Sequence, residues 1–185
     1  NTISVANTGF ADAAGNAGIG VTASSNYAVD TARPTVAISM ADTELRPGET
    51  SLVTFTFSDA VTGFSNADLT VANGTLDAVT TADGGITWTA AFTPATNASA
   101  TGNVITVTNT GLADLAGNAG SGTTNSPEYA VATRAPSAAI ALSDTVLKAG
   151  ETAVVTITFS EAVNGFTLAD LNAANGTLGD RKSVV

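Results

Sequence analysis

Two copies of one loop rich in Asp, Asn and Gly contain the residues best able to do chemistry. Residues 8–18 read TGFADAAGNAG and residues 110–120 read TGLADLAGNAG, which places Asp12 and Asn16 in one copy and Asp114 and Asn118 in the other. Carboxylate and amide oxygens are ligands that Ca²⁺ prefers, and the glycines allow a tight bend. The competing interpretation is that Asp and Asn next to Gly bond only their own backbone within a turn. The loop itself leaves both open.

Other catalytic and binding chemistries lack the residues they need. The sequence has no His and no Cys, which removes the usual general base, the thiolate nucleophile and disulfides. It also lacks a nucleophile elbow and a phosphate-binding glycine loop followed by a helix. Paired carboxylates could in principle hydrolyse glycosides, but these recur with the repeat, whereas catalysis needs one constellation. We expect no enzymatic activity.

The loop recurs because nearly the whole sequence repeats. Residues 1–34 align without a gap on residues 103–136, and residues 34–76 align on residues 136–178, always 102 positions apart, with roughly 46 identical residues. The sequence therefore predicts a window on a tandem array: the C-terminal part of one repeat (1–33), a complete repeat (34–135) and the N-terminal part of another (136–179). Residues 180–185, DRKSVV, break the repeat and match one reading frame of a sequencing adapter. They are predicted to be a non-native read-through tail, with a divergent native tail as the alternative.

The pattern of the complete repeat predicts strands. TSLVTFTFS places Val53, Phe55 and Phe57 on one face, and PTVAISM, ITWTAAFTP, NVITVTN and EYAVAT also alternate, with Ile86 assigned to the same inward face as Trp88. Pro47-Gly48 and DGG at 83–85 mark turns, and Asn73-Gly74 predicts a tight hairpin between DLTVAN and GTLDAVTT. About seven short strands, A to G, predict an all-β antiparallel Greek-key sandwich.

Two aromatic residues allow a second interpretation. Trp88 and Tyr129 could bind a sugar, but each is in phase with the apolar face of its strand, which favours a place in the core.

No run reaches the roughly 20 apolar residues of a membrane span. The sequence has 16 acidic and 6 basic residues and a net charge of −10, which disfavours nucleic acid and anionic lipid and favours cations.

Several motifs together resemble a known family. GETAVVTITFSEAVNGFTLADL, NGTL, DGGITWTAAFTP and DLAGNAGSG followed by YAV are similar to the bacterial immunoglobulin-like repeats of large RTX- and Bap-type cell-surface adhesins. The resemblance covers essentially all of residues 1–179. It implies an immunoglobulin-like sandwich strung in arrays on the bacterial surface, many of them exported by type I secretion. It therefore implies an extracellular location and a role in adhesion and biofilm formation, with neighbouring repeats as partners and an unknown distal target.

A spacer is the function that these observations favour. The loops carry few aromatic residues or arginines, and the two copies of each loop are nearly alike, as expected of a repeat that supplies length and solubility. The alternative is a binding module whose loops contact a glycan or a host protein.

The predicted strand order brings the repeated loop to the linker that precedes the complete repeat. We expect Asp114 and Asn118 beside Asp30, with Asp59 close by and Asp68 or Asp83 within reach. The resemblance implies calcium at such junctions, where it would fix the angle between neighbours; Asp12 and Asn16 are the equivalent pair. At the second junction Ala132 replaces Asp30, which predicts weaker binding unless Glu161 compensates.

Overall fold

The complete repeat is a two-layer β-sandwich. A computed structural model describes residues 1–179, and the chain divides into two units after Thr133. One layer of the repeat has the order β3-β5-β10-β8, with β9 paired to β10. These strands are β3 (Val36–Met40), β5 (Ser51–Phe57), β8 (Gly74–Leu76), β9 (Thr80–Thr81) and β10 (Thr87–Pro94).

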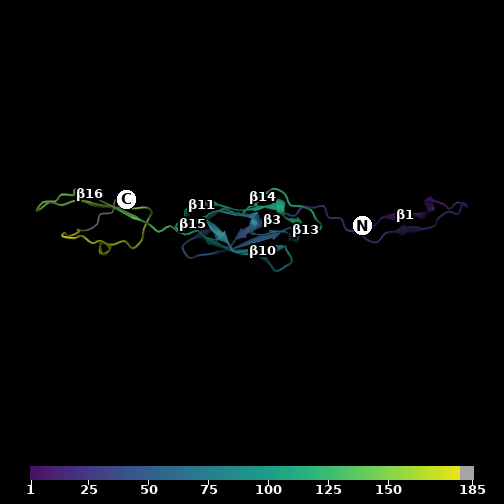
Figure 1. Cartoon of the computed structure of the whole chain (residues 1–185), viewed down its shortest axis with the longest axis horizontal. Coiled ribbons are helices and arrows are strands. Elements are labelled where there is room, and N and C mark those ends of the chain that lie inside the picture. The colour runs from purple at the N-terminus through teal and green to yellow at the C-terminus, as the bar shows by residue number, and fades with distance from the viewer. Residues whose placement is uncertain (180–185) are drawn as a thin grey trace. The chain divides into compact units, whose positions relative to one another are not determined.

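The second layer consists of shorter sheets (Figure 1). Their orders are β14-β12-β7, β11-β15-β4 and β13-β6. The strands are β4 (Glu44–Leu45), β6 (Val61–Thr62), β7 (Leu69–Val71), β11 (Ser99–Asn103), β12 (Ile105–Thr108), β13 (Ala113–Asp114), β14 (Thr123–Asn125) and β15 (Tyr129–Ala132). By the predicted letters, the first layer is A-B-E-D, as in a constant-type immunoglobulin sandwich. In the second layer, strand C (β7) pairs with strand F (β12), while strand G (β15) pairs with β11 and β4. The predicted all-β Greek-key fold is confirmed.

Alternating apolar residues build the core as the sequence indicates. Val53 and Phe55 on β5 are fully buried, and Leu52, which directly precedes Val53, is exposed. Phe64 lies at the centre of an aromatic cluster, with its ring 5.2 Å from Phe55 and 5.4 Å from Trp88, both edge-on. Such edge-to-face pairs add to the free energy gained from burying their area.

Both aromatic residues considered for sugar binding belong to this core. Tyr129 is buried, its ring lies 5.0 Å from Phe92, and its hydroxyl donates to the carbonyl of Ala72. Burial raises the pKa of the Tyr129 hydroxyl. Trp88 is half-buried against the core, and its indole nitrogen donates to the carbonyl of Gly85 at 3.1 Å. Their core interpretation is confirmed.

The predicted hairpin at Asn73-Gly74 is wrong. Asn73 has the positive φ, +49°, that suits a turn, but β7 pairs with β12 and β8 pairs with β10. The chain therefore crosses between the layers here. A Cβ on Gly74 would lie 2.2 Å from the ring of Phe92, so the glycine provides the close packing that this crossing requires.

The prediction that Ile86 faces inward is also wrong, because its side chain is exposed. It precedes β10 and lies in the turn where its N–H donates to Asp83, so the alternation of β10 does not extend to it. The structure also has more and shorter strands than the seven predicted, thirteen between residues 36 and 132. Two-residue strands such as β4 and β6 are too short to show a period in sequence.

The terminal segments form small two-stranded sheets. In the first, β1 (Ser4–Ala6) pairs with β2 (Val21–Ala23); in the second, β16 (Ala138–Leu142) pairs with β17 (Val155–Phe159). Four 3-10 turns complete the described residues, η1 (Asn7–Gly9), η2 (Asn66–Asp68), η3 (Asn109–Gly111) and η4 (Leu168–Asp170). Residues 171–173, the counterparts of β7, are not in a strand.

The predicted read-through tail, 180–185, lies outside the described residues. Among residues 1–179, no helix is long and apolar enough to cross a membrane.

Candidate functional site

The repeated loop of the complete repeat closes on itself through Asp114 and Asn118. One carboxylate oxygen of Asp114 accepts the backbone N–H of Asn118 at 2.8 Å, and the other accepts the Asn118 side-chain amide at 2.8 Å. The backbone N–H of Asp114 in turn donates to the Asn118 carbonyl at 3.2 Å. The spacing of four residues thus produces a closed turn that uses both side chains.

Two of the loop's three glycines, Gly117 and Gly120, hold positions that its backbone reserves for glycine. Gly117 has φ of +89°, a conformation that strongly favours glycine. A Cβ on Gly120 would lie 2.4 Å from the carbonyl oxygen of Asn109, so only glycine permits this approach. In the first copy Gly15 has φ of +88°, and a Cβ on Gly18 would lie 2.2 Å from the carbonyl of Asn7. The backbone geometry of the turn is therefore enough to explain why the motif recurs.

The first copy makes the same turn without a domain around it. Asp12 accepts the backbone N–H groups of Ala14 and Asn16, both at 2.9 Å, and the Asn16 side-chain amide at 2.7 Å. Asp12 is exposed, whereas Asp114 is buried. The turn is therefore specified locally, and its burial is specified by the rest of the repeat.

Hydrogen bonds keep both aspartates charged. The side-chain amide of Asn118 is the main reason that the pKa of Asp114 is below its usual value, and Asn16 does the same for Asp12. In each case desolvation opposes the shift but is outweighed.

The linker lies against this loop, as predicted. The Asn118 side-chain amide donates to the carbonyl of Asp30 at 3.3 Å, and the Arg33 guanidinium donates to the carbonyl of Ala119 at 2.9 Å. Figure 1 shows β13, which opens the loop, at the end of the repeat where the linker reaches it. Sequence reasoning missed Arg33. No local pattern could reveal this contact, because the accepting carbonyl lies 86 residues away in the sequence.

The other predicted cation ligands are engaged elsewhere. The Asp30 carboxylate accepts the backbone N–H of Ala32 at 3.1 Å, and Asp59 accepts the hydroxyl of Ser58 at 2.8 Å. Asp68 caps η2 and contacts the approach to the loop at Gly111, where a Cβ would lie 2.7 Å from its oxygen.

Asp83 belongs to its own turn before β10. Its carboxylate accepts the backbone N–H of Thr87 at 2.9 Å and the hydroxyl of Thr81 at 2.9 Å. These bonds, with that of the Thr87 N–H the strongest, lower the pKa of Asp83 to about 2. Its carboxylate therefore stabilises the turn rather than pointing to the repeated loop.

The arrangement of these residues does not fit a preformed cation site. Within residues 1–179, no three His, Cys, Asp or Glu side chains gather as metal ligands. Of the predicted set, only Asp114, Asn118 and the main chain of Asp30 meet, and the Asp114 oxygens already accept donors. Calcium at Asp30, Asp59, Asp114 and Asn118 stays a prediction, as does weaker binding at the Ala132 junction.

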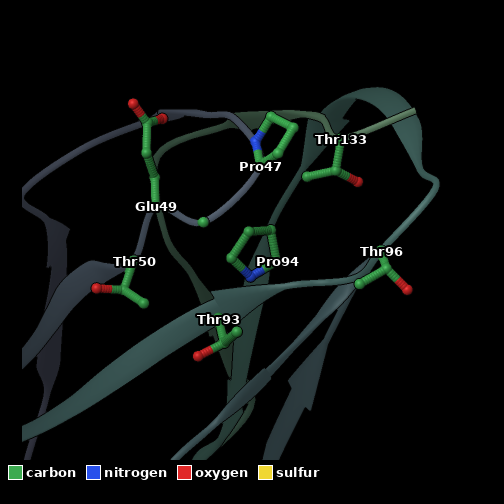
Figure 2. Close-up of a pocket in the computed structure, with 8 residues that line it drawn as sticks. Pro47, Glu49, Thr50, Thr93, Pro94, Thr96 and Thr133 are labelled. Atoms are coloured by element: carbon green, nitrogen blue, oxygen red, sulfur yellow. The ribbon is translucent and has the colours of Figure 1, made fainter. Parts of the chain in front are cut away.

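A shallow hollow of about 280 Å³ lies elsewhere on the repeat, between the Pro47-Gly48 turn and the end of β10 (Figure 2). Its walls are threonines, two prolines and one charged residue, Glu49. The Glu49 carboxylate accepts the backbone N–H of Arg46 at 2.8 Å, so it stabilises the turn. The hollow offers no aromatic or arginine side chain of the kind that anchors a partner.

Comparison with known proteins gives one match. The family model described as "Bacterial Ig-like domain" matches residues 30–131 and 132–184. A search of curated proteins and a search of solved structures found no match.

Proposed function

Because the chain belongs to the bacterial Ig-like domain family, we propose that it is a spacer segment of a large bacterial surface adhesin. Domains of this family are structural or binding modules, typically extracellular and non-enzymatic. In the proposed role, successive repeats separate a distal adhesive part from the cell and neighbouring repeats are the partners of each unit. An acidic surface, with net charge −10, would keep such an array soluble.

The observation that carries the proposal is the contact between the repeated loop and the linker. Two hydrogen bonds, from Asn118 to Asp30 and from Arg33 to Ala119, connect the linker to the loop of the repeat that follows it. A spacer needs a restricted angle between units, and a linker bonded to a rigid turn has less conformational freedom than a free one. In this proposal the loop orients the linker and does not bind a ligand.

Calcium would strengthen this junction only through rearrangement. The carboxylate of Asp114 would have to exchange its amide donors for the cation, and the carboxylates of Asp30 and Asp59 would have to turn toward it. We therefore attribute the restricted orientation of the linker to the protein's own hydrogen bonds. Bound Ca²⁺ would add to this restriction under calcium-rich extracellular conditions.

Distance distributions between spin labels can test the orienting role. Because the sequence has no cysteine, Ser25→Cys and Ala82→Cys place single labels on the first hairpin and on the complete repeat. We expect Arg33→Ala to broaden the distribution, since the bond to Ala119 is lost. Arg46→Ala, in the distant Pro47-Gly48 turn, is the matched control and should leave it unchanged. Equal distributions for all three proteins would contradict the orienting role.

Two additions to this experiment examine the finer proposals. Millimolar Ca²⁺ should narrow the distribution and raise the melting temperature if the cation binds, and Asp114→Ala should remove both effects. A glycan array with residues 34–135 addresses the alternative of a binding module. Saturable binding at micromolar concentration would favour that alternative over a spacer.

A further inference from the structure

The complete repeat ends in a threonine that ties the outgoing linker to the repeat it leaves. The hydroxyl of Thr133 donates to the carbonyl of Ala95 at 2.5 Å and accepts the backbone N–H of Ala98 at 3.0 Å. The backbone N–H of Thr133 donates to the Ala98 carbonyl at 2.8 Å. The turn between β10 and β11 therefore holds Thr133 through both its side chain and its main chain.

This turn is itself fixed to the rest of the repeat. The backbone N–H of Ala95 donates to the Asn73 carbonyl at 2.8 Å, and Ala98 packs against the core. Asn97 has φ of +55°, in the left-handed region that Asn tolerates better than most residues, and it reverses the chain between the two strands. The start of the outgoing linker is thus connected to the core of its own repeat.

The linker that enters the repeat is held from the following side. Asn118 and Arg33 make the two bonds between linker and loop, and the Asp30 carboxylate accepts the backbone N–H of Ala32 within the linker. Pro34 ends the linker with a buried ring and a restricted φ. These four linker residues therefore have little remaining freedom.

Thr31 is the remaining linker residue, and it is the counterpart of Thr133 at the offset of 102 residues. The bonds that Thr133 makes to its own repeat are available to Thr31 from the corresponding turn of a preceding repeat. A linker with the sequence VDTARP can therefore be bonded to both of its neighbours, with no residue left free between them.

The second linker keeps the threonine but loses the side chains on the following side. It reads VATRAP, so Ala132 replaces Asp30 and Ala135 replaces Arg33, while Arg134 occupies the position of Ala32. The bond within the linker and the guanidinium bond to the loop both need side chains that alanine lacks. One bond remains available, from the Asn118 type of amide to a main-chain carbonyl, and at 3.3 Å it is the longest of the three.

We propose that the two linkers encode joints of different stiffness: VDTARP fixes the angle between two complete repeats, whereas VATRAP is a hinge. In both, the threonine attaches the linker to the preceding repeat. Only Asp30 and Arg33 attach it firmly to the following one. The inference rests on the proposed spacer role and adds to it a threonine anchor and a second, flexible kind of joint.

The whole chain lengthened by one repeat tests the proposal. A second copy of residues 34–135, inserted after Ala135, places VATRAP between two complete repeats. Three substitutions in that linker, Ala132→Asp, Arg134→Ala and Ala135→Arg, convert it to VDTARP. Spin labels at Ala82→Cys in both copies then report the distribution of distances between the repeats, since the sequence has no other cysteine. We expect a narrow distribution with VDTARP and loss of the narrow distribution with VATRAP.

The threonine anchor is tested in the VDTARP protein. Thr133→Val keeps the shape of the side chain but cannot bond the turn, so it should broaden the distribution, and Thr133→Ser, which keeps the hydroxyl, should not. Thr96→Val is the matched control, because Thr96 lies in the same turn, is exposed and has a hydroxyl with no hydrogen-bond partner among residues 1–179. Both threonines line the hollow in Figure 2. Circular dichroism verifies that each variant is folded.

Equal distributions for VDTARP and VATRAP would overturn the proposal, whether both are narrow or both are broad. So would a narrow distribution for Thr133→Val, since the linker would then not depend on the preceding repeat. Failure of the orienting role of the loop is distinguishable, because Arg33→Ala then leaves the distances in the original chain unchanged. If Arg33→Ala broadens those distances while Thr133→Val has no effect, the spacer role stands and this inference does not.

Discussion

The complete repeat and the terminal segments carry clearly related sequences in different surroundings. Phe159 on β17 and Phe57 on β5 have the same identity and the same alternating neighbours, but only Phe57 is buried. The aromatic pair Phe57–Phe64, at 5.1 Å, recurs as Phe159–Phe166 at 5.0 Å. Local geometry is therefore preserved without the sandwich, while burial depends on the other strands. The comparison teaches which interactions belong to a segment and which to the assembled domain.

The largest contrast is expected for a core aromatic and its counterpart. Phe55→Ala should cost about 3–5 kcal/mol of unfolding free energy, because it leaves a cavity at a fully buried site. Ile157→Ala, at the counterpart on β17, should leave the main unfolding transition unchanged. Urea denaturation monitored by Trp88 fluorescence measures both. A comparable loss in the two variants would mean that the C-terminal segment unfolds with the complete repeat.

A glycine substitution should give the next largest effect. Gly120→Ala forces a Cβ toward the Asn109 carbonyl and should cost about 1–3 kcal/mol, as overpacking does. Gly18→Ala creates the same conflict in the exposed first copy, so the melting temperature of the complete repeat should not change. Thermal denaturation by circular dichroism compares them. If Gly120→Ala melts like the parent protein, the loop does not need this close approach.

The hydroxyl of buried Tyr129 donates a hydrogen bond inside the core, whereas its counterpart Tyr27 is exposed. Tyr129→Phe removes the donor to the Ala72 carbonyl and should cost about 1 kcal/mol. Tyr27→Phe should have no measurable effect, because Tyr27 is 45% exposed. Chemical denaturation with both variants provides the measurement. A cost for Tyr27→Phe would show that the first hairpin is packed on another surface in solution.

The smallest effect is expected in the pH dependence of the melting temperature under acidic conditions. The pKa of Asp83 is about 2 in the folded repeat against an ordinary value of 3.8, so its hydrogen bonds stabilise the fold above that value. This stabilisation is lost as the pH falls from about 4 to about 2. Asp83→Asn should make the melting temperature less dependent on pH in that window, while Asp42→Asn serves as the control. Since residues 1–29 and 136–179 contain no counterpart of Asp83, this response reports the complete repeat alone. An unchanged slope would contradict the role of the turn.

The fold was predictable where the sequence contains a period. The alternation in β5 and the repeat of 102 residues specify strands and their inward faces before any partner is known. The choice of partner strand is different: Asn73 has the positive φ of a turn, but β7 pairs with β12 and β8 pairs with β10, so the chain crosses between layers there. Strands of two residues, such as β4 and β13, depend wholly on their partners and leave no local signal.

For the candidate site, sequence reasoning placed the loop correctly beside the linker. It identified Asp114, Asn118 and Asp30 as neighbours because strand order determines which loops share an end. It could not decide how each carboxylate is used, since the same residues suit a turn and a cation. Nor did it find Arg33, whose long side chain reaches a carbonyl 86 residues away along the chain.

The parallel pairing of β4 and β15 has a mechanical consequence. It joins a strand near the beginning of the repeat to its last strand, with Ala130 opposite Glu44 and Val131 opposite Leu45. Tension applied through residues 34 and 133 first loads β3, which pairs with β5; once β3 has detached, the tension pulls β4 and β15 past each other along their length. The bonds across the pair are then strained together instead of opening one after another, so rupture requires their simultaneous failure. In the proposed spacer role, this pair would therefore resist further extension of the repeat after β3 has detached.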